Sequence, residues 1–132
     1  ASSIEATLDK FAADYGVSMP LDDLLRGDPH SVMMAGAKAH RYVGLSEVHG
    51  VPCHHLLVGQ EDVNWQIWIE SGDKMLPRQV VITYMNLPMA PVFIDVLREC
   101  DLNPNLPEAK FKAQIPADAT QIDFMTLKEE RP

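Results

Sequence analysis

This sequence lacks most of the features that identify a class of protein at a glance. Its 132 residues contain only two cysteines, and no apolar run approaches the roughly 18 residues that a membrane-spanning helix needs, so we expect no transmembrane segment. Lysine and arginine number 11 against 19 aspartates and glutamates, which gives a net charge of -8. Because binding to a phosphate backbone depends on neutralisation by lysine and arginine, we expect no nucleic-acid partner.

Motifs of catalysis are also missing. The chain has no glycine-rich phosphate loop, no G-x-S-x-G nucleophile elbow and no H-E-x-x-H zinc motif. Cys53 and His54 are consecutive on a predicted strand, so their side chains point to opposite faces and do not form a nucleophile and base pair. For the same reason His54 and His55 cannot both bind one metal ion without a bulge. We expect no enzymatic activity, no metal site and no cofactor.

The composition that remains is typical of a globular protein. Hydrophobic residues make up 46% and charged residues 23% of the chain. We predict a single domain over residues 1–132, with a helical segment at about 3–35 and an antiparallel sheet at about 37–126. Cys53 and Cys100 leave two interpretations open, a disulfide in an oxidising compartment or two free thiols.

Helical periodicity is confined to the front of the chain. Apolar residues recur every three or four positions over the first 15 residues or so, which predicts a helix. Ser2 and Glu5 have the spacing of a capping box, and Gly16 is placed to end this helix. Pro20 and the two aspartates after it predict a short second helix. A third helical turn is predicted over residues 28–36.

From about residue 37 the apolar period changes to two, and turn residues recur at regular intervals, which is typical of consecutive antiparallel strands. We predict strands near residues 37–48, 52–59, 63–70, 78–86, 91–99 and 120–126. The proline-rich segment 103–107 predicts a surface loop, followed by a short strand around Phe111. The predicted fold is α+β, a curved antiparallel sheet of about six strands with the N-terminal helices on its concave face.

The segment 63–70 predicts which face of the sheet is buried. Its odd positions are all apolar, which places Trp65 on a buried face and Trp68 on a wetter one. Trp68 either covers the outer side of the sheet or contacts a partner, and it is our candidate for a partner contact. If the helices cover the apolar face incompletely, the gap is a cavity for a hydrophobic ligand. The predicted lining consists of Leu56, Val58, Trp65, Ile67, Ile69, Val80 and Ile82, with the other face of strand 78–86 as an alternative.

Four segments carry a resemblance to a known family. They read P-L-D-D-L-L at 20–25, G-V-P-C-H-H-L at 50–56, N-W-Q-I-W-I-E at 64–70 and L-P-R-Q-V-V-I-T-Y at 76–84. From about Leu8 to Phe124 the chain resembles an uncharacterised family of predicted bacterial periplasmic proteins. That family is similar to the lipoprotein carriers and receptors LolA and LolB and to the lipid-sensing regulator RseB, which are half-open antiparallel barrels with helices in the concave face.

The resemblance implies a periplasmic location, with an export signal cleaved or removed from this chain. It also implies a LolA-like half-barrel that lacks strands before the first helix, as in the C-terminal part of a longer precursor or in a shortened relative. By analogy of fold it implies an apolar concavity that accepts acyl chains.

From this resemblance and the predicted apolar face, we predict a non-catalytic periplasmic protein that binds a hydrophobic ligand, either a lipid or a lipidated protein. The alternative is a protein–protein interaction or envelope-stress regulatory module. Such a module would use an exposed strand edge to bind another envelope protein, and the same edge would allow a homodimer.

Overall fold

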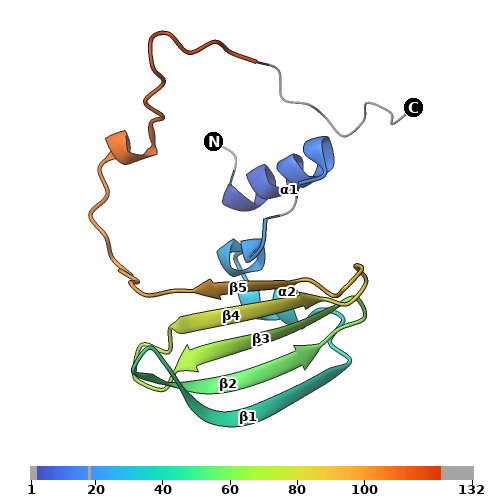
Figure 1. Ribbon diagram of the computed structural model, residues 1–132. Coiled ribbons are helices and arrows are strands. Elements are labelled where there is room, and N and C mark those ends of the chain that lie inside the picture. The colour runs from blue at the N-terminus through green and yellow to red at the C-terminus, as the bar shows by residue number, and fades with distance from the viewer. Residues whose placement is uncertain (1–2, 18, 123–132) are drawn as a thin grey trace. The chain divides into compact units, whose positions relative to one another are not determined.

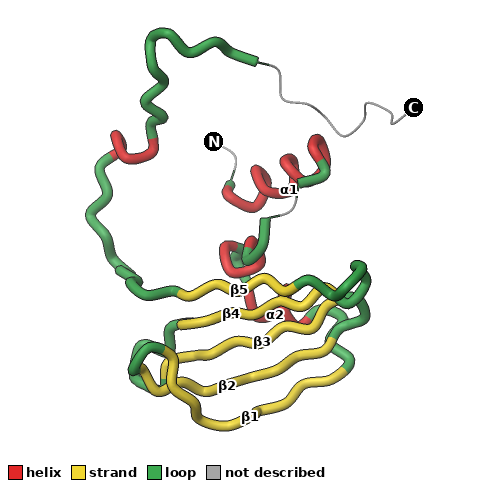
Figure 2. Tube along the Cα trace, in the orientation of Figure 1, coloured by secondary structure: helices red, strands yellow, loops and turns green. Residues whose placement is uncertain are grey.

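A computed structural model describes residues 3–17 and 19–122. The chain divides into two compact units, one formed by Ala1–Gly27 with Asp101–Pro132 and the other by Asp28–Cys100. The second unit contains the entire sheet of the described chain (Figures 1 and 2). The single domain over residues 1–132 stays a prediction.

The first unit begins with α1 (Ile4–Tyr15), as the apolar periodicity predicts. Its N-cap is Ser3, whose Oγ accepts the backbone N–H of Ala6 at 3.1 Å. The predicted cap, Ser2, lies outside the described residues. Gly16 ends the helix with φ 63°, the left-handed conformation that glycine adopts most easily. The predicted second helix is a short 3₁₀ turn, η1 (Asp22–Leu25).

The later part of the first unit corrects two predictions. Phe111 belongs to the 3₁₀ turn η2 (Glu108–Phe111) and not to a strand. The reason is local, because Pro107 precedes the turn and Glu108 lies in its first residues, where each favours a helical start. Of the predicted sixth strand, residues 120–122 have no strand structure, and residues 123–126 lie outside the described part of the chain.

The second unit is built on five strands in sequential order, each antiparallel to the next (Figure 2). They are β1 (Ala39–Val48), β2 (Val51–Gly59), β3 (Val63–Glu70), β4 (Pro77–Tyr84) and β5 (Val92–Val96). The α+β class and the antiparallel sheet are therefore confirmed. The sheet of the described residues has five strands instead of about six, it is not closed into a barrel, and a LolA-like half-barrel is not confirmed.

Turn and bulge residues set the register of this sheet. His49 and Gly50, with φ 47° and 82°, form the two-residue turn between β1 and β2, in the interval between the predicted strands 37–48 and 52–59. The register shifts between Tyr42 and Gly44 in β1, and again where β4 pairs with β3 around Arg78. Such bulges increase the twist of the strands that carry them.

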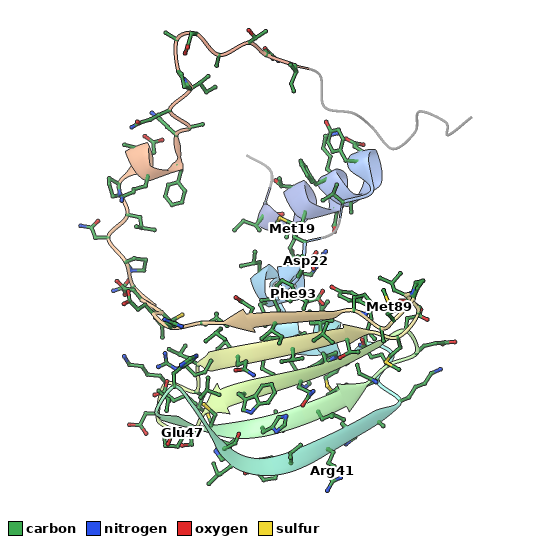
Figure 3. The ribbon with its side chains drawn as sticks, in the orientation of Figure 1. Met19, Asp22, Arg41, Glu47, Met89 and Phe93 are labelled. Carbon is green, nitrogen blue, oxygen red and sulfur yellow. The ribbon has the colours of Figure 1, made fainter. Side chains whose placement is uncertain are left out.

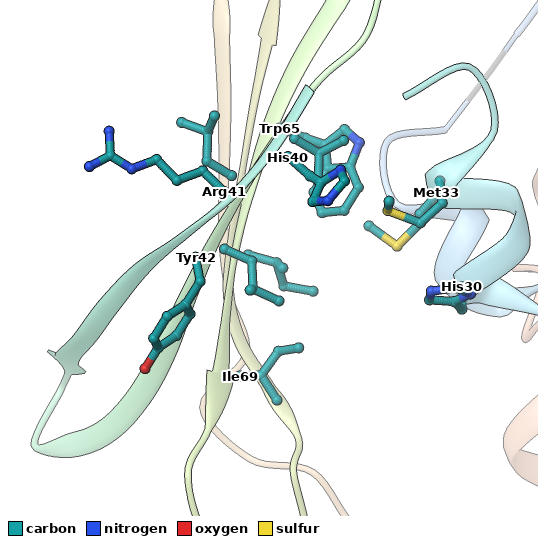
Figure 4. Close-up of a pocket in the computed structure, with 12 residues that line it drawn as sticks. His30, Met33, His40, Arg41, Tyr42, Trp65 and Ile69 are labelled. Atoms are coloured by element: carbon teal, nitrogen blue, oxygen red, sulfur yellow. The ribbon is translucent and has the colours of Figure 1, made fainter. Parts of the chain in front are cut away.

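Helix α2 (Pro29–Met34) lies against one face of the sheet (Figures 1 and 4). Asp28 caps it by accepting the backbone N–H of Ser31 at 3.1 Å, as the prediction for residues 28–36 requires. Gln60 holds the other end, because its side-chain amide donates to the carbonyls of Met33 and Ala35 at 3.0 and 2.7 Å. These bonds attach the short helix to the loop between β2 and β3.

The buried apolar residues of the second unit lie on the strands, except for Leu76, which directly precedes β4. They are Val48, Cys53, Val58, Trp65, Ile67, Leu76 and Val80. Trp65 is 9% exposed, as the alternation in β3 predicts, whereas Trp68 is half-buried on the opposite face. The face that bears Trp65 is the one that α2 approaches (Figure 4).

Candidate functional site

A hollow of about 410 Å³ lies between α2 and strands β1 to β3. In Figure 4, Trp65 and Ile69 of β3 lie on one side of it and Met33 and His30 of α2 on the other. The lining residues are His30, Met33, Met34, His40, Arg41, Tyr42, Leu56, Leu57, Val58, Trp65, Ile67 and Ile69.

Strand register explains why apolar side chains gather on the sheet side. Val58 pairs with Trp65, and Leu56 pairs with Ile67. Directly opposed residues of antiparallel strands point to the same face, and alternate residues along each strand share it. The period-two pattern of β2 and β3 therefore becomes one continuous apolar surface.

The hollow exists because α2 is too short to cover that surface. The helix has six residues, and it contributes Met33 and Met34 to the lining. Methionine is flexible and polarizable, so it suits an adaptable wall. A longer amphipathic helix at this place would fill the gap with its own side chains.

Five of the seven residues predicted to line a cavity do line this hollow, namely Leu56, Val58, Trp65, Ile67 and Ile69. Val80 and Ile82 share their face, because they pair with Ile67 and Trp65, but they are not part of the lining. Val80 is fully buried in the sheet. Binding of a ligand by any of these residues stays a prediction.

Sequence reasoning missed the lining residues of α2 and β1, and it also missed Leu57 of β2. For β1 a signal existed, because His40 and Tyr42 pair with Val58 and Leu56 and so share their face. For α2, the local sequence pattern does not show whether the helix covers the apolar face of the sheet completely or leaves part of it uncovered.

The polar residues of the lining include no aspartate or glutamate. His30 and His40 are on opposite walls, one on α2 and the other on β1 (Figure 4). The Tyr42 hydroxyl and His54 Nδ1 are joined by a hydrogen bond of 3.0 Å. Arg41 extends away from α2 (Figures 3 and 4), so only the base of this residue is near the hollow.

Trp68 lies outside the hollow, on the opposite face of the sheet. Its ring stacks on the His55 imidazole with centroids 4.0 Å apart and planes 12° from parallel. His55 Nε2 is in turn 2.9 Å from Gln66 Oε1. Contact between Trp68 and a partner protein stays a prediction.

Both cysteines are free thiols. Cys53 is fully buried, its Sγ donates to the Val51 carbonyl at 3.3 Å, and burial raises the pKa of this thiol above its ordinary value. A raised pKa leaves little of the reactive thiolate. Cys100 is exposed.

Among residues 3–17 and 19–122, no three His, Cys, Asp or Glu side chains are grouped so that they could hold a metal ion. No helix in this part of the chain has both the length and the apolar composition needed to cross a bilayer.

Comparison with known families supplies the class of the protein. The family described as Predicted periplasmic protein (DUF2092) matches residues 1–125. The chain belongs to this family. The predicted periplasmic location is thereby confirmed for this DUF2092 protein, and the function of the family is unknown. No curated protein and no solved structure gives a significant match, and nothing in these comparisons supports the likeness to LolA, LolB and RseB.

Proposed function

We propose that this DUF2092 protein is a non-catalytic periplasmic binding protein whose hydrophobic ligand, a lipid or the acyl chain of a lipidated protein, occupies the hollow between α2 and the sheet. One observation carries the proposal, the largely apolar hollow of about 410 Å³. Sites for small molecules have volumes of about 300–1,000 Å³ and are lined mainly by apolar side chains with a few polar groups.

Burial of hydrocarbon is the main source of affinity for such a ligand. Each methylene group removed from water contributes about 0.8 kcal/mol, so ten of them contribute about 8 kcal/mol. This is comparable with the entropic cost of association, which is of the order of 4–15 kcal/mol. A protein of this kind needs no polar motif in its sequence.

The absence of catalysis is part of the proposal, and the surroundings of Cys53 support it. This thiol is buried, and its neighbour in sequence, His54, is on the other face of β2, where it bonds to Tyr42. Nucleophilic catalysis requires an accessible thiol within hydrogen-bond reach of a base.

The test has two parts. The full chain, purified from the periplasm, is analysed by native mass spectrometry for bound lipid, and the delipidated protein is titrated with the neutral fluorescent probe N-phenyl-1-naphthylamine. We expect a lipid adduct and saturable binding at a stoichiometry of one. Leu56→Trp, which fills the hollow, should weaken probe binding.

Leu45→Trp is the matched control, because Leu45 is 66% exposed and lies outside the lining. This variant should bind the probe as the wild type does. Absence of both adduct and saturable binding in the folded wild type would reject the proposal.

A second candidate function, an interaction module, is favoured by β5. Within the described residues this strand pairs on one side only, with β4, and its Val92 and Ile94 are 54% and 62% exposed. Unpaired, apolar edge strands are sites at which another chain adds a strand. Light scattering after size exclusion should then show a defined oligomer that Ile94→Lys dissociates, and a monomer at all concentrations would reject a homodimer through this edge.

A further inference from the structure

We propose that the ligand is a single-chain fatty acid of about 12 to 16 carbons and not a lipid with two or three acyl chains. This inference rests on the proposed function and specifies the chemical class that the hollow accepts. It depends on two features of the same site, its capacity and the kind of polar side chains in its lining.

The capacity of the hollow corresponds to one hydrocarbon chain. A methylene group is about as large as a water molecule, whose share of liquid volume is roughly 30 Å³. A hollow of about 410 Å³ therefore accommodates about 14 such groups. A phospholipid with two chains, or a lipoprotein with three, would leave half or more of its hydrocarbon outside.

The arrangement of the lining also fits one chain. Trp65, Ile67 and Ile69 form a row along β3 that is about 13 Å long, given a rise of about 3.3 Å per residue. Leu56 and Val58 form the adjacent row on β2, about 4.8 Å away. Most of an extended chain of about 14 carbons lies along the two rows, with Met33 and Met34 of α2 over it.

The polar side chains favour an acidic headgroup. His30 and His40, one on each wall, can donate N–H groups to a carboxylate, and neither can offer a negative charge. Asp28 is near His30, but its carboxylate is used to cap α2 and is not part of the lining. An ammonium headgroup would meet no carboxylate in the lining, although the chain carries 19 acidic residues against 11 basic ones.

The experiment displaces N-phenyl-1-naphthylamine from the full chain with saturated fatty acids of 8 to 18 carbons, each below its critical micelle concentration. We expect the affinity to rise about fourfold per added methylene and to stop rising at about 14 carbons, where the hollow is full. Tetradecanoate should bind at least about tenfold more tightly than tetradecylamine and also more tightly than dimyristoyl phosphatidic acid.

Variants test the capacity of the hollow and the role of its polar side chains separately. With Leu56→Trp, the affinity should stop rising at a shorter fatty-acid chain than in the wild type. With Leu45→Trp, outside the hollow, it should stop rising at the same chain length as in the wild type. The double variant His30→Ala and His40→Ala should reduce the ratio of tetradecanoate to tetradecanol affinity. His49→Asn, in the β1–β2 turn and outside this lining, is the control for loss of a histidine.

The outcomes distinguish this inference from the proposed function. If the probe binds but affinity keeps rising to 18 carbons, or if the two-chain lipid or the amine binds as well as tetradecanoate, the fatty-acid inference is wrong and the hydrophobic binding site remains. If neither the probe nor any lipid binds to the folded protein, both are wrong.

Discussion

At the residue scale, Arg78 makes the largest set of side-chain bonds in the described part of the sheet unit. Its Nε and Nη2 donate to Glu70 Oε2 at 3.0 and 2.6 Å, and its Nη1 donates to the Arg98 carbonyl at 3.0 Å. The Arg78 and Glu70 side chains are only 18% and 22% exposed. The guanidinium therefore joins β3 and β4 to the segment that follows β5, at the position where the register shifts.

Replacement of Arg78 by alanine should lower the free energy of unfolding by about 1–3 kcal/mol, because Glu70 loses its partner in a poorly solvated position. Urea denaturation measures the change. Arg78→Lys should recover only part of it, since an ammonium group cannot reproduce the planar fork of donors. Arg41→Ala, on an exposed side chain, is the matched control and should change stability by less than about 0.5 kcal/mol. Equal losses of unfolding free energy in Arg78→Ala and Arg41→Ala would contradict the stabilising role of the Arg78 bonds.

At the scale of elements, the turn between β1 and β2 depends on one glycine. Gly50 has φ 82°, and a Cβ added there would meet no atom within 4 Å, so any cost of a side chain is conformational and not steric. Gly50→Ala should lower the free energy of unfolding by roughly 1–2 kcal/mol. Gly72→Ala is the control, because its backbone is not left-handed and its nearest contact would be an ordinary 3.4 Å. Urea midpoints that shift equally in the two variants would contradict the conformational explanation.

Helix α2 gives a prediction that depends on pH. Hydrogen bonds from the side chain and the backbone N–H of Ser31 lower the pKa of Asp28 below its ordinary value of 3.8. A lowered folded-state pKa stabilises the fold above the unfolded-state value, and this contribution is lost as the pH falls through the folded-state value. The wild type should thus be more stable than Asp28→Ala at neutral pH, and the difference should shrink below about pH 3.8.

Asp28→Asn is the matched variant for this cap, since asparagine accepts the same backbone bond without titrating. Asp28→Asn should remain more stable to unfolding than Asp28→Ala in acid. Urea denaturation between pH 7 and pH 3 tests both variants, and probe binding reports whether a weakened α2 also impairs the hollow. A pH-independent difference between wild type and Asp28→Ala would show that the charge of Asp28 is irrelevant.

At the scale of the whole molecule, the two units should differ in resistance to protease. Every described residue from Asp101 to Ile122 is exposed, whereas the strands share a continuous network of backbone bonds. Trypsin should therefore cleave after Lys110 and Lys112 before it cleaves after Arg41 or Arg78, because cleavage requires local unfolding of the substrate backbone. Mass spectrometry of timed digests identifies the order. The double variant Lys110→Gln and Lys112→Gln should lose the early products. Early cleavage within the strands would contradict the expected difference in protease resistance between the two units.

Particular elements show how far the sequence could be interpreted. The alternation in Val63–Glu70 predicts that Trp65 is buried and Trp68 is on the other face, and the structure confirms both. The predicted strand at Phe111 is wrong, because an apolar residue after a proline-rich loop carries no periodicity that distinguishes a strand from a 3₁₀ turn. The lining was predicted for β2 and β3 but not for α2, since helical periodicity does not state how much of a sheet six residues cover.

By itself, the sequence determined the local features of this protein. Period-two patterns specified the strands, His49 and Gly50 specified the turn, and Asp28 and Gly16 specified helix ends, since each depends on residues close together in the chain. Only the tertiary structure decided that a hollow separates α2 from the sheet, and which side chains meet there. Its existence depends on the length of the helix, on the bonds of Gln60 and on the register of three strands together, and no single segment contains that information.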